Sequence, residues 1–264
     1  MSRLLSFSYG ISLEFTRPVN DHYFVLRCVP GSFPGQRILS CSTMIGPGAD
    51  WIEQKDGFGN NLQVGQIIEP HRGLQYSVMG VAETDTTLAN TEDANPIYGF
   101  ASKLTVESPQ MAAFRRETDT SDPEKIMLAV HDRLMYVPGS TDVRTGAAQA
   151  FEAGRGVCQD FAHVCIALER AAGYRCRYAN GIHIGSTLSH AWLEVWHDGR
   201  WIGMDPTEGR LTDDTYIRFN TGRDFADCPI ECGSFKGGAA QLQTVSLQCY
   251  EIAADRSAKQ RTEQ

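Results

Sequence analysis

Apolar and polar residues alternate through the first third of the chain. In ISLEF (11–15) and YFVLRCV (23–29), every second side chain falls on one apolar face. Glycine- and proline-rich segments that favour turns separate these runs: PGSFPG (30–35), GPGAD (46–50) and DGFGN (56–60). The pattern predicts short antiparallel strands, and we expect residues 1–83 to form a β-sandwich-like N-terminal domain.

The pattern changes at Thr84. Residues 84–96, TDTTLANTEDANP, are polar and acidic with little apolar periodicity, which indicates a linker or a surface crossing over residues 84–120. We place a second domain at residues 121–253. The charged residues 254–264 are expected to be a frayed tail.

Helical periodicity starts the second domain. Pro123 suits the first position of a helix after Ser121 or Asp122, and Ile126, Val130 and Leu134 follow at intervals of four. A shorter helix is expected from Thr145 to Gly154, and another from Cys158 to about residue 172, with Gly173 as its C-cap. Alternation returns in TYIRF (215–219) and TVSLQCYEI (244–252). Strands and helices in separate blocks predict an α+β fold.

Cys158 would lie in the first turn of its helix. Free backbone N–H groups and the positive end of the helix dipole stabilise a thiolate at this position, and they can also donate to a developing oxyanion. A small buried cysteine without chemistry could occupy the same position. The helix alone therefore leaves both interpretations open.

A hairpin provides possible partners for the thiol. Asp198-Gly199 favours a two-residue turn, and this turn makes residues whose numbers sum to 397 face each other. His190 and Asp205 then lie diagonally on one face, about 7–8 Å apart between Cα atoms, within reach of a side-chain hydrogen bond. Trp192 lies beside His190 on that face and is our candidate for lining a pocket. The opposite face is apolar and suited to packing on helices.

The composition of the chain indicates which classes of partner and which cellular location to expect. The 264 residues carry a net charge of −8, which argues against nucleic acid as a partner because phosphate binding needs a basic patch. The N-terminus lacks the features of a signal peptide, and no apolar run is long enough to span a membrane. We expect a cytoplasmic protein without a membrane partner. The eight cysteines have no framework spacing and are expected to be mostly reduced.

Three segments together resemble the transglutaminase-like superfamily. They are GVCQDFAH (156–163), SHAWLEVW (189–196) and WIGMDPTEG (201–209), in the family's order of a Gly-x-Cys helix start, a His-Ala-Trp strand and an Asp-Pro-Thr strand end. The chain is most similar to bacterial transglutaminase-like proteins of the cysteine protease type, which carry a β-rich N-terminal domain. The resemblance implies a papain-like α+β core, with Cys158 as nucleophile, His190 as general base and acid, and Asp205 as the orienting carboxylate.

The resemblance implies a thiol-dependent acyl transfer on a peptide or amide bond of a peptide or protein substrate. Hydrolysis, as in a cysteine peptidase or amidase, is slightly favoured over transfer to an amine. Family members place an aromatic residue or glutamine upstream of the cysteine as an oxyanion donor. Tyr136 and Gln149 are candidates here, although the backbone N–H of Cys158 is the safer one. His183, on a predicted strand, is a candidate for substrate contact. No cofactor and no metal are implied.

Two alternatives stay open. A non-catalytic binding or scaffolding module could keep this fold, but such modules usually lack part of the triad. A metal site could use Cys158, His163, His183 or His190, but their spacing matches no familiar ligand pattern. The sequence does not indicate the substrate, the acyl acceptor, the role of the β domain or the oligomeric state.

Overall fold

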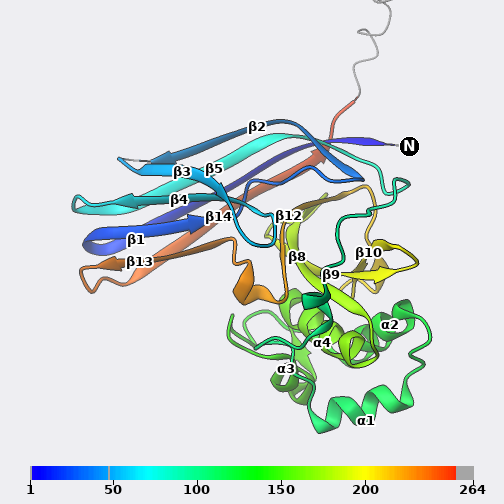
Figure 1. The fold of residues 1–264 in the computed structure, drawn as a ribbon. Helices are drawn as coiled ribbons and strands as arrows, with labels where there is room; N and C mark the ends of the chain where they lie inside the picture. The colour runs from blue at the N-terminus through cyan, green and yellow to red at the C-terminus, as the bar shows by residue number, and fades with distance from the viewer. Residues whose placement is uncertain (1, 47, 254–264) are drawn as a thin grey trace, which may run out of the picture.

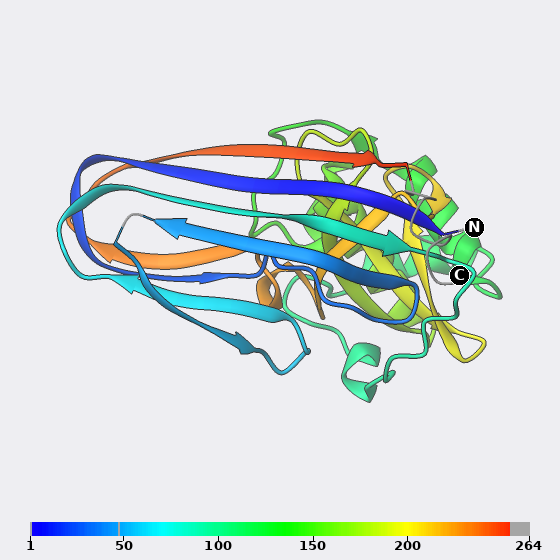
Figure 2. The same cartoon turned by 90° about the horizontal axis from the view of Figure 1, so that it is seen from above.

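A computed structural model describes residues 2–46 and 48–253. Its β-rich half is organised by one long strand, β1 (Arg3–Leu26). The other strands of this half are β2 (Gln36–Gly46), β3 (Asp50–Lys55), β4 (Asn61–Ile67), β5 (His71–Thr84), β13 (Glu231–Lys236) and β14 (Gln241–Glu251). Figures 1 and 2 show these strands running as an elongated stack away from the helices.

β1 belongs to two layers because its pairing changes along its length. Its first half pairs with β5 and β14, and β5 also pairs with β2. Its second half pairs with β4 and β13, and β4 also pairs with β3. The alternating apolar residues of both halves meet in one core that includes Phe7, Leu13 and Phe24. The predicted β-rich N-terminal region is confirmed.

Two C-terminal strands join this half, which the sequence analysis did not anticipate. We expected residues 121–253 to form one domain, but β13 and β14 both pair with β1. The reason is that β1 offers a free edge on each of its halves, and strand pairing satisfies the backbone polar groups there. The sheet of the second half of the molecule therefore contains no strand from the described residues 231–253. The tail expected at residues 254–264 lies outside the described residues.

The second half is built on a five-stranded antiparallel sheet. Its strand order is β11 (Arg210–Leu211), β10 (Arg200–Asp205), β9 (His190–His197), β8 (Arg175–His183) and β12 (Tyr216–Gly222). The β9–β10 hairpin has the predicted register, with Arg200 opposite His197 and Met204 opposite Leu193. Asp198 and Gly199 both have positive φ, as the predicted two-residue turn requires.

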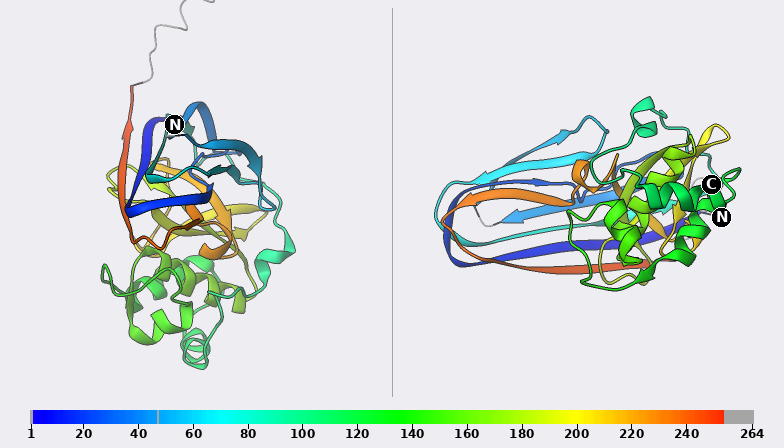
Figure 3. Two further views of the ribbon diagram at one scale, coloured as in Figure 1. Left: turned by 90° about the vertical axis from the view of Figure 1, so that its left-hand side faces the viewer. Right: turned by 90° about the horizontal axis from the view of Figure 1, so that it is seen from below.

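Helices cover one face of this sheet (Figure 1; Figure 3, left). They are α1 (Pro109–Glu117), α2 (Pro123–Arg133), α3 (Ala147–Ala153) and α4 (Cys158–Ala171). Two short strands, β6 (Met135–Tyr136) and β7 (Arg155–Gly156), pair in parallel, and the 3₁₀ helices are η1 (Pro96–Gly99) and η2 (Phe225–Asp227). α4 is buried against the apolar face of the β9–β10 hairpin, as predicted. None of the helices among the described residues is long and apolar enough to cross a membrane.

The segment after β5 first crosses the opposite face of the sheet as the expected irregular crossing, with η1 after it, and then continues to α1 on the helical side. Glu92 in this segment accepts hydrogen bonds at 2.7 Å from Arg177 and 2.8 Å from Arg218. Both arginines also bond to Glu194, and these two arginines and Glu194 are buried. A paired and hydrogen-bonded charge cluster of this kind holds the crossing segment on the sheet.

Candidate active site

Cys158 is the first residue of α4 and is partly exposed. The helix starts here because the preceding Val157 has extended backbone angles. The C-cap of α4 is Ala172, one residue before the predicted Gly173, and Gly173 follows with φ of 100°, the left-handed conformation that ends the helix. Cys158 therefore lies at the end of α4 where backbone N–H groups lack intrahelical partners.

Asp160 fixes the start of α4. Its Oδ2 accepts hydrogen bonds from the backbone N–H of Val157 at 2.8 Å and from the Thr141 hydroxyl at 2.6 Å. A side chain at Gly156 would collide with Asp160, since an added Cβ would lie 2.5 Å from the Asp160 Cβ. Gly156, two residues before Cys158, thus leaves room for the Asp160 carboxylate that caps the helix.

His190 and Asp205 meet on one face of the β9–β10 hairpin. His190 Nε2 lies 2.6 Å from Asp205 Oδ2, and Asp205 is fully buried. Since the carboxylate can only accept, the Nε2–H of His190 donates and Nδ1 is left for another partner. The diagonal contact expected from the hairpin register is present.

Asp205 is held by three further hydrogen bonds. The Tyr216 hydroxyl donates to its Oδ2 at 2.8 Å, and the backbone N–H groups of Thr207 and Glu208 donate to its Oδ1 at 2.9 and 3.1 Å. Burial opposes ionisation of this carboxyl, but the hydrogen bond and charge of His190 outweigh burial and hold the pKa of Asp205 below its usual range. Asp205 is therefore an oriented carboxylate.

Cys158 lies next to the His190 ring. Burial by itself would favour the neutral ring, but the hydrogen bond and negative charge of Asp205, followed by the neighbouring Cys158 side chain, raise the pKa of His190 to about 10. The contact with sulfur is looser than the one with Asp205, because Cys158 makes no hydrogen bond of ordinary geometry among the described residues. Such looseness is common before a substrate enters. The structure brings Cys158, His190 and Asp205 together in the order that a thiol nucleophile needs.

His183 stands beside this group. Its ring centroid lies 5.0 Å from that of His190 and 5.0 Å from that of Tyr216. Its Nδ1 is 2.9 Å from the carbonyl oxygen of Ile184, so Nδ1–H donates and Nε2 remains an acceptor. Burial, reinforced by the charge of His190, lowers the pKa of His183. His183 is thus a neutral imidazole next to His190, and its contact with substrate stays a prediction.

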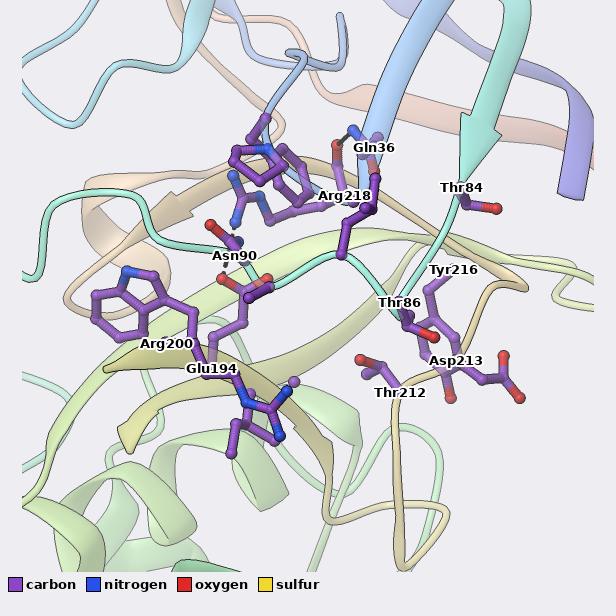
Figure 4. Close-up of a pocket in the computed structure, with 18 of the residues that line it drawn as sticks. Gln36, Thr84, Thr86, Asn90, Glu194, Arg200, Thr212, Asp213, Tyr216 and Arg218 are labelled. Carbon is purple, nitrogen blue, oxygen red and sulfur yellow. Dashed lines mark hydrogen bonds and ion pairs between the residues drawn. The ribbon is translucent and has the colours of Figure 1, made fainter. Parts of the chain in front are cut away.

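Trp192 is buried to 2% exposure and packs between His190 and Tyr216. It lines a cavity of about 270 Å³, as does Tyr216, but Cys158 and His190 do not. Figure 4 shows the crossing segment with Thr86 and Asn90 running over this cavity, opposite Glu194 and Tyr216. The predicted pocket residue therefore lines a cavity behind the His190 ring, and its contact with substrate stays a prediction.

The two upstream candidates for an oxyanion donor lie in different places. The Gln149 side chain accepts a hydrogen bond from the backbone N–H of Gly146 at 3.1 Å, which caps α3. Tyr136 is half exposed and lies in β6 beside Gly156 of β7. Burial and the nearby Cys158 and Glu208 charges raise the pKa of Tyr136. Of the two, only Tyr136 lies beside the cysteine.

Two residues of this site were missed by the sequence analysis. Tyr216 comes from β12, and no local pattern indicates that this strand lies near the hairpin. Glu208 follows the Asp205-Pro-Thr segment, so its position three residues after Asp205 was a signal that could have been used. Within residues 2–46 and 48–253, no group of three or more His, Cys, Asp or Glu side chains is arranged to hold a metal ion.

Two family models match the chain. The transglutaminase-like superfamily matches residues 111–206, and the bacterial transglutaminase-like N-terminal region matches residues 5–83. Cys158, His190 and Asp205 all fall within the first of these ranges.

Relatives and a solved structure extend the similarity to most of the chain. An uncharacterized protein of Mycobacterium tuberculosis is 30% identical over 237 residues, covering 74% of this chain and 75% of its own. One of Mycobacterium leprae is 26% identical over 260 residues, covering 88% and 93%. The crystal structure of a "Putative Cysteine Protease" from Cytophaga hutchinsonii has a TM-score of 0.78 and 22% identity, covering 97% of this chain and 93% of that one. It has the same fold.

Proposed function

Because the chain belongs to the transglutaminase-like superfamily, a family of thiol-dependent enzymes, we propose that it catalyses acyl transfer from a peptide or amide bond through Cys158, His190 and Asp205. The observation that carries the proposal is the 2.6 Å hydrogen bond between His190 and the buried Asp205, with Cys158 next to the same ring.

In the first half of the reaction, the proton of the Cys158 thiol is held on Nδ1 of His190, because the pKa of His190 is raised to about 10 and the ring is an imidazolium at neutral pH. The Cys158 sulfur then attacks the carbonyl carbon of the substrate amide. As the tetrahedral intermediate collapses, the carbon–nitrogen bond breaks, and His190 returns the proton to the leaving amine. A thioester on Cys158 remains.

Asp205 has a positioning role in this scheme. Its Oδ2 holds the His190 ring with Nδ1 directed away from the carboxylate, and its negative charge stabilises the imidazolium. Tyr216 and the two backbone N–H groups in turn fix the carboxylate.

The developing oxyanion needs hydrogen-bond donors. The backbone N–H of Cys158 is one donor, because the first turn of α4 leaves it free of an intrahelical partner. The Tyr136 hydroxyl is the second, because Tyr136 lies beside Cys158 and is half exposed.

We favour water as the acceptor of the acyl group from the Cys158 thioester. The substrate is then a peptide or protein. His190 would then deprotonate the water, and hydrolysis would release an acid and the free thiol. Transfer to an amine uses the same thioester, so both outcomes depend on Cys158.

The test is a comparison of two cysteine variants on a panel of peptide amides. Cys158→Ala is expected to abolish turnover and the thioester adduct seen by intact-protein mass spectrometry, while its circular dichroism spectrum matches the wild type. Cys232→Ala removes another exposed thiol and is expected to keep full activity. Turnover retained in Cys158→Ala would refute the proposal.

A further inference from the structure

The cavity behind the His190 ring lies where three parts of the molecule meet (Figure 4). Gln36 lines it from the β-rich half, Asn90 from the crossing segment and Trp192 from the β9–β10 hairpin. Neither Cys158 nor His190 lines it, so it is separate from the place where the Cys158 sulfur would meet a substrate. No step of the proposed acyl transfer uses this cavity.

The cavity is large enough for a small organic molecule and open enough to admit one. A cavity of about 150 Å³ can hold a benzene ring, and pockets for drug-sized ligands start at about 300 Å³. A volume of about 270 Å³ therefore suits a molecule with one ring and one small polar group. Thr86, Leu88 and Ala89 of the crossing segment line the cavity and are exposed, so they form its mouth.

Four aromatic side chains line the cavity: Phe33, Trp192, Trp201 and Tyr216. The last three are buried. Trp192 and Tyr216 pack edge to face with ring centroids 5.4 Å apart, and each ring restrains the other. Flat apolar walls favour an occupant with a planar apolar body, because aromatic rings gain from edge-to-face and offset-stacked contacts.

The ionisable residues that line the cavity carry no net charge. They are two acids and two bases: Glu194, Asp213, Arg200 and Arg218. Only Glu194 and Arg218 are buried, and they bond to each other at 2.8 Å. A charged occupant would lose hydration in the buried part of the cavity without gaining an unpaired counter-charge there. The lining therefore favours an uncharged molecule.

Glu194 provides a hydrogen-bond acceptor inside the cavity. It is 6% exposed, and its Oε2 accepts from Arg177 at 2.7 Å and from Arg218 at 2.8 Å. Its Oε1 has no donor among residues 2–46 and 48–253, but this atom is not sealed in the core as both carboxyl oxygens of Glu169 are. A fixed acceptor on a cavity wall is suited to an N–H donor of an occupant.

We propose that this cavity is a second binding site, for a small uncharged molecule with one planar ring and an N–H donor directed at Glu194. This is the chemistry of an aromatic carboxamide. The donor would bond to the free Oε1 of Glu194, and the ring would pack on Trp192 and Tyr216.

An occupant would contact two residues that touch the proposed catalytic group. The Trp192 ring stacks on that of His190 with centroids 6.4 Å apart, and the Tyr216 hydroxyl donates to Asp205 at 2.8 Å. A filled cavity restrains both rings, because side chains that line an empty space lack packing partners on that side. Resting on the proposed function, occupancy of the cavity therefore raises kcat.

The first test needs no substrate. Benzamide is titrated into the full chain while the indole N–H signals are followed by ¹H–¹⁵N NMR. The signals of Trp192 and Trp201 are expected to shift and saturate, whereas that of Trp51 in β3 should stay in place. Acetophenone lacks the N–H donor and should bind about tenfold more weakly. Benzoate and benzamidinium, which carry a charge on the same ring, should also bind about tenfold more weakly.

Two outcomes of this titration would overturn the site. One is the absence of any shift at Trp192 up to the solubility limit of benzamide. The other is binding of benzoate or benzamidinium that equals or exceeds that of benzamide.

The second test blocks the mouth of the cavity. Ala89→Phe places a ring there, and Ala101→Phe places the same ring at an exposed position that does not line the cavity. Ala89→Phe is expected to weaken benzamide binding about tenfold, because the added ring takes up space that the ligand needs. Ala101→Phe should leave the Kd unchanged. Equal Kd values for the two variants would overturn the site.

Kinetics distinguish regulation from binding at Cys158. On a peptide amide that the wild type cleaves, saturating benzamide is expected to raise kcat about twofold with KM unchanged, because the catalytic group is better positioned. Ala89→Phe should remove this effect. An unchanged kcat, or a rise in KM from competition with substrate, would overturn the regulatory role. Turnover retained in Cys158→Ala would instead refute the proposed function, and the NMR titration would still decide whether the cavity binds the amide.

Discussion

Asp205 contacts Tyr216 and His190 through the same carboxylate oxygen, at 2.8 and 2.6 Å. Tyr216 comes from β12, at one edge of the five-stranded sheet, whereas His190 and Asp205 come from the β9–β10 hairpin. The contact joins a strand that also packs into the core of the β-rich half, through Ile217 and Phe219, to the proposed catalytic group. The β-rich half therefore braces the site through β12.

Removal of the Tyr216 hydroxyl should loosen Asp205. Tyr216→Phe is expected to lower kcat about fivefold with little change in KM, because the lost hydrogen bond is worth about 1 kcal/mol and acts on the orientation of His190. Steady-state kinetics on any peptide amide that the wild type cleaves would measure this. Tyr98→Phe removes a hydroxyl from η1 and should leave kcat unchanged. Equal losses in both variants would contradict the positioning role.

The His190 ring should remain protonated well above neutral pH. Its pKa is raised to about 10 because the hydrogen bond and charge of Asp205, together with the neighbouring Cys158 side chain, outweigh the effect of burial. NMR titration of the ring Hε1 is expected to give this value in the wild type and lower values in Asp205→Asn and Cys158→Ala. Asp213→Asn removes an exposed carboxylate and serves as the control. A titration near 6.5 in the wild type would show that the three residues are not assembled.

The raised pKa of His190 also predicts how the stability of the folded protein depends on pH. A histidine whose pKa is higher in the folded state than the ordinary 6.5 stabilises the fold fully below pH 6.5, and this stabilisation declines as the pH rises through about 10. The melting temperature of the wild type should therefore fall more between pH 7 and pH 10.5 than that of His190→Gln. Parallel curves for the two proteins would exclude this contribution of His190.

Tyr136 should act on the transition state. If its hydroxyl donates to the oxyanion, Tyr136→Phe is expected to lower kcat about 100-fold, in the range found when one oxyanion donor is removed, with KM nearly unchanged. Tyr174→Phe is the matched control, because the Tyr174 hydroxyl bonds to the carbonyl oxygen of Thr120. A rise in KM at constant kcat would assign Tyr136 to substrate binding instead.

A histidine pair whose inner member is buried should make the β-rich half sensitive to acid. His22 is 2% exposed, and its Nδ1 lies 3.1 Å from Nε2 of His71. Burial, followed by the charge of His71, lowers the pKa of His22 to about 4. The unfolded chain therefore binds a proton more readily than the folded one, and stability should fall as the pH drops from about 6.5 to 4. Phe15 and Phe235 pack on His22, so phenylalanine suits this position.

The comparison is between the melting temperatures of the wild type and His22→Phe across this range. Both are expected to be folded at pH 7.5, and His22→Phe should lose less of its melting temperature on acidification. If the variant loses as much as the wild type, other groups cause the acid sensitivity.

The local elements of this protein follow from its sequence. The start of α2 after Asp122, the start of α4 at Cys158 and the turn at Gly173 depend on caps and side-chain periodicity within a few residues, so they could be predicted. The contact of His190 with Asp205 also follows from local information, because the Asp198-Gly199 turn fixes the hairpin register and the register places both side chains on one face.

Tertiary structure alone decided which distant segments meet. The alternation in residues 244–252 predicts a strand, but it contains no information on whether that strand joins the second sheet or pairs with β1, as it does. The positions of Tyr216 beside Asp205 and of Glu92 on the buried arginines depend likewise on pairing between strands or segments far apart in the chain. Periodicity shows which face of an element is buried, whereas the partner that buries it is selected by the packing of the whole molecule.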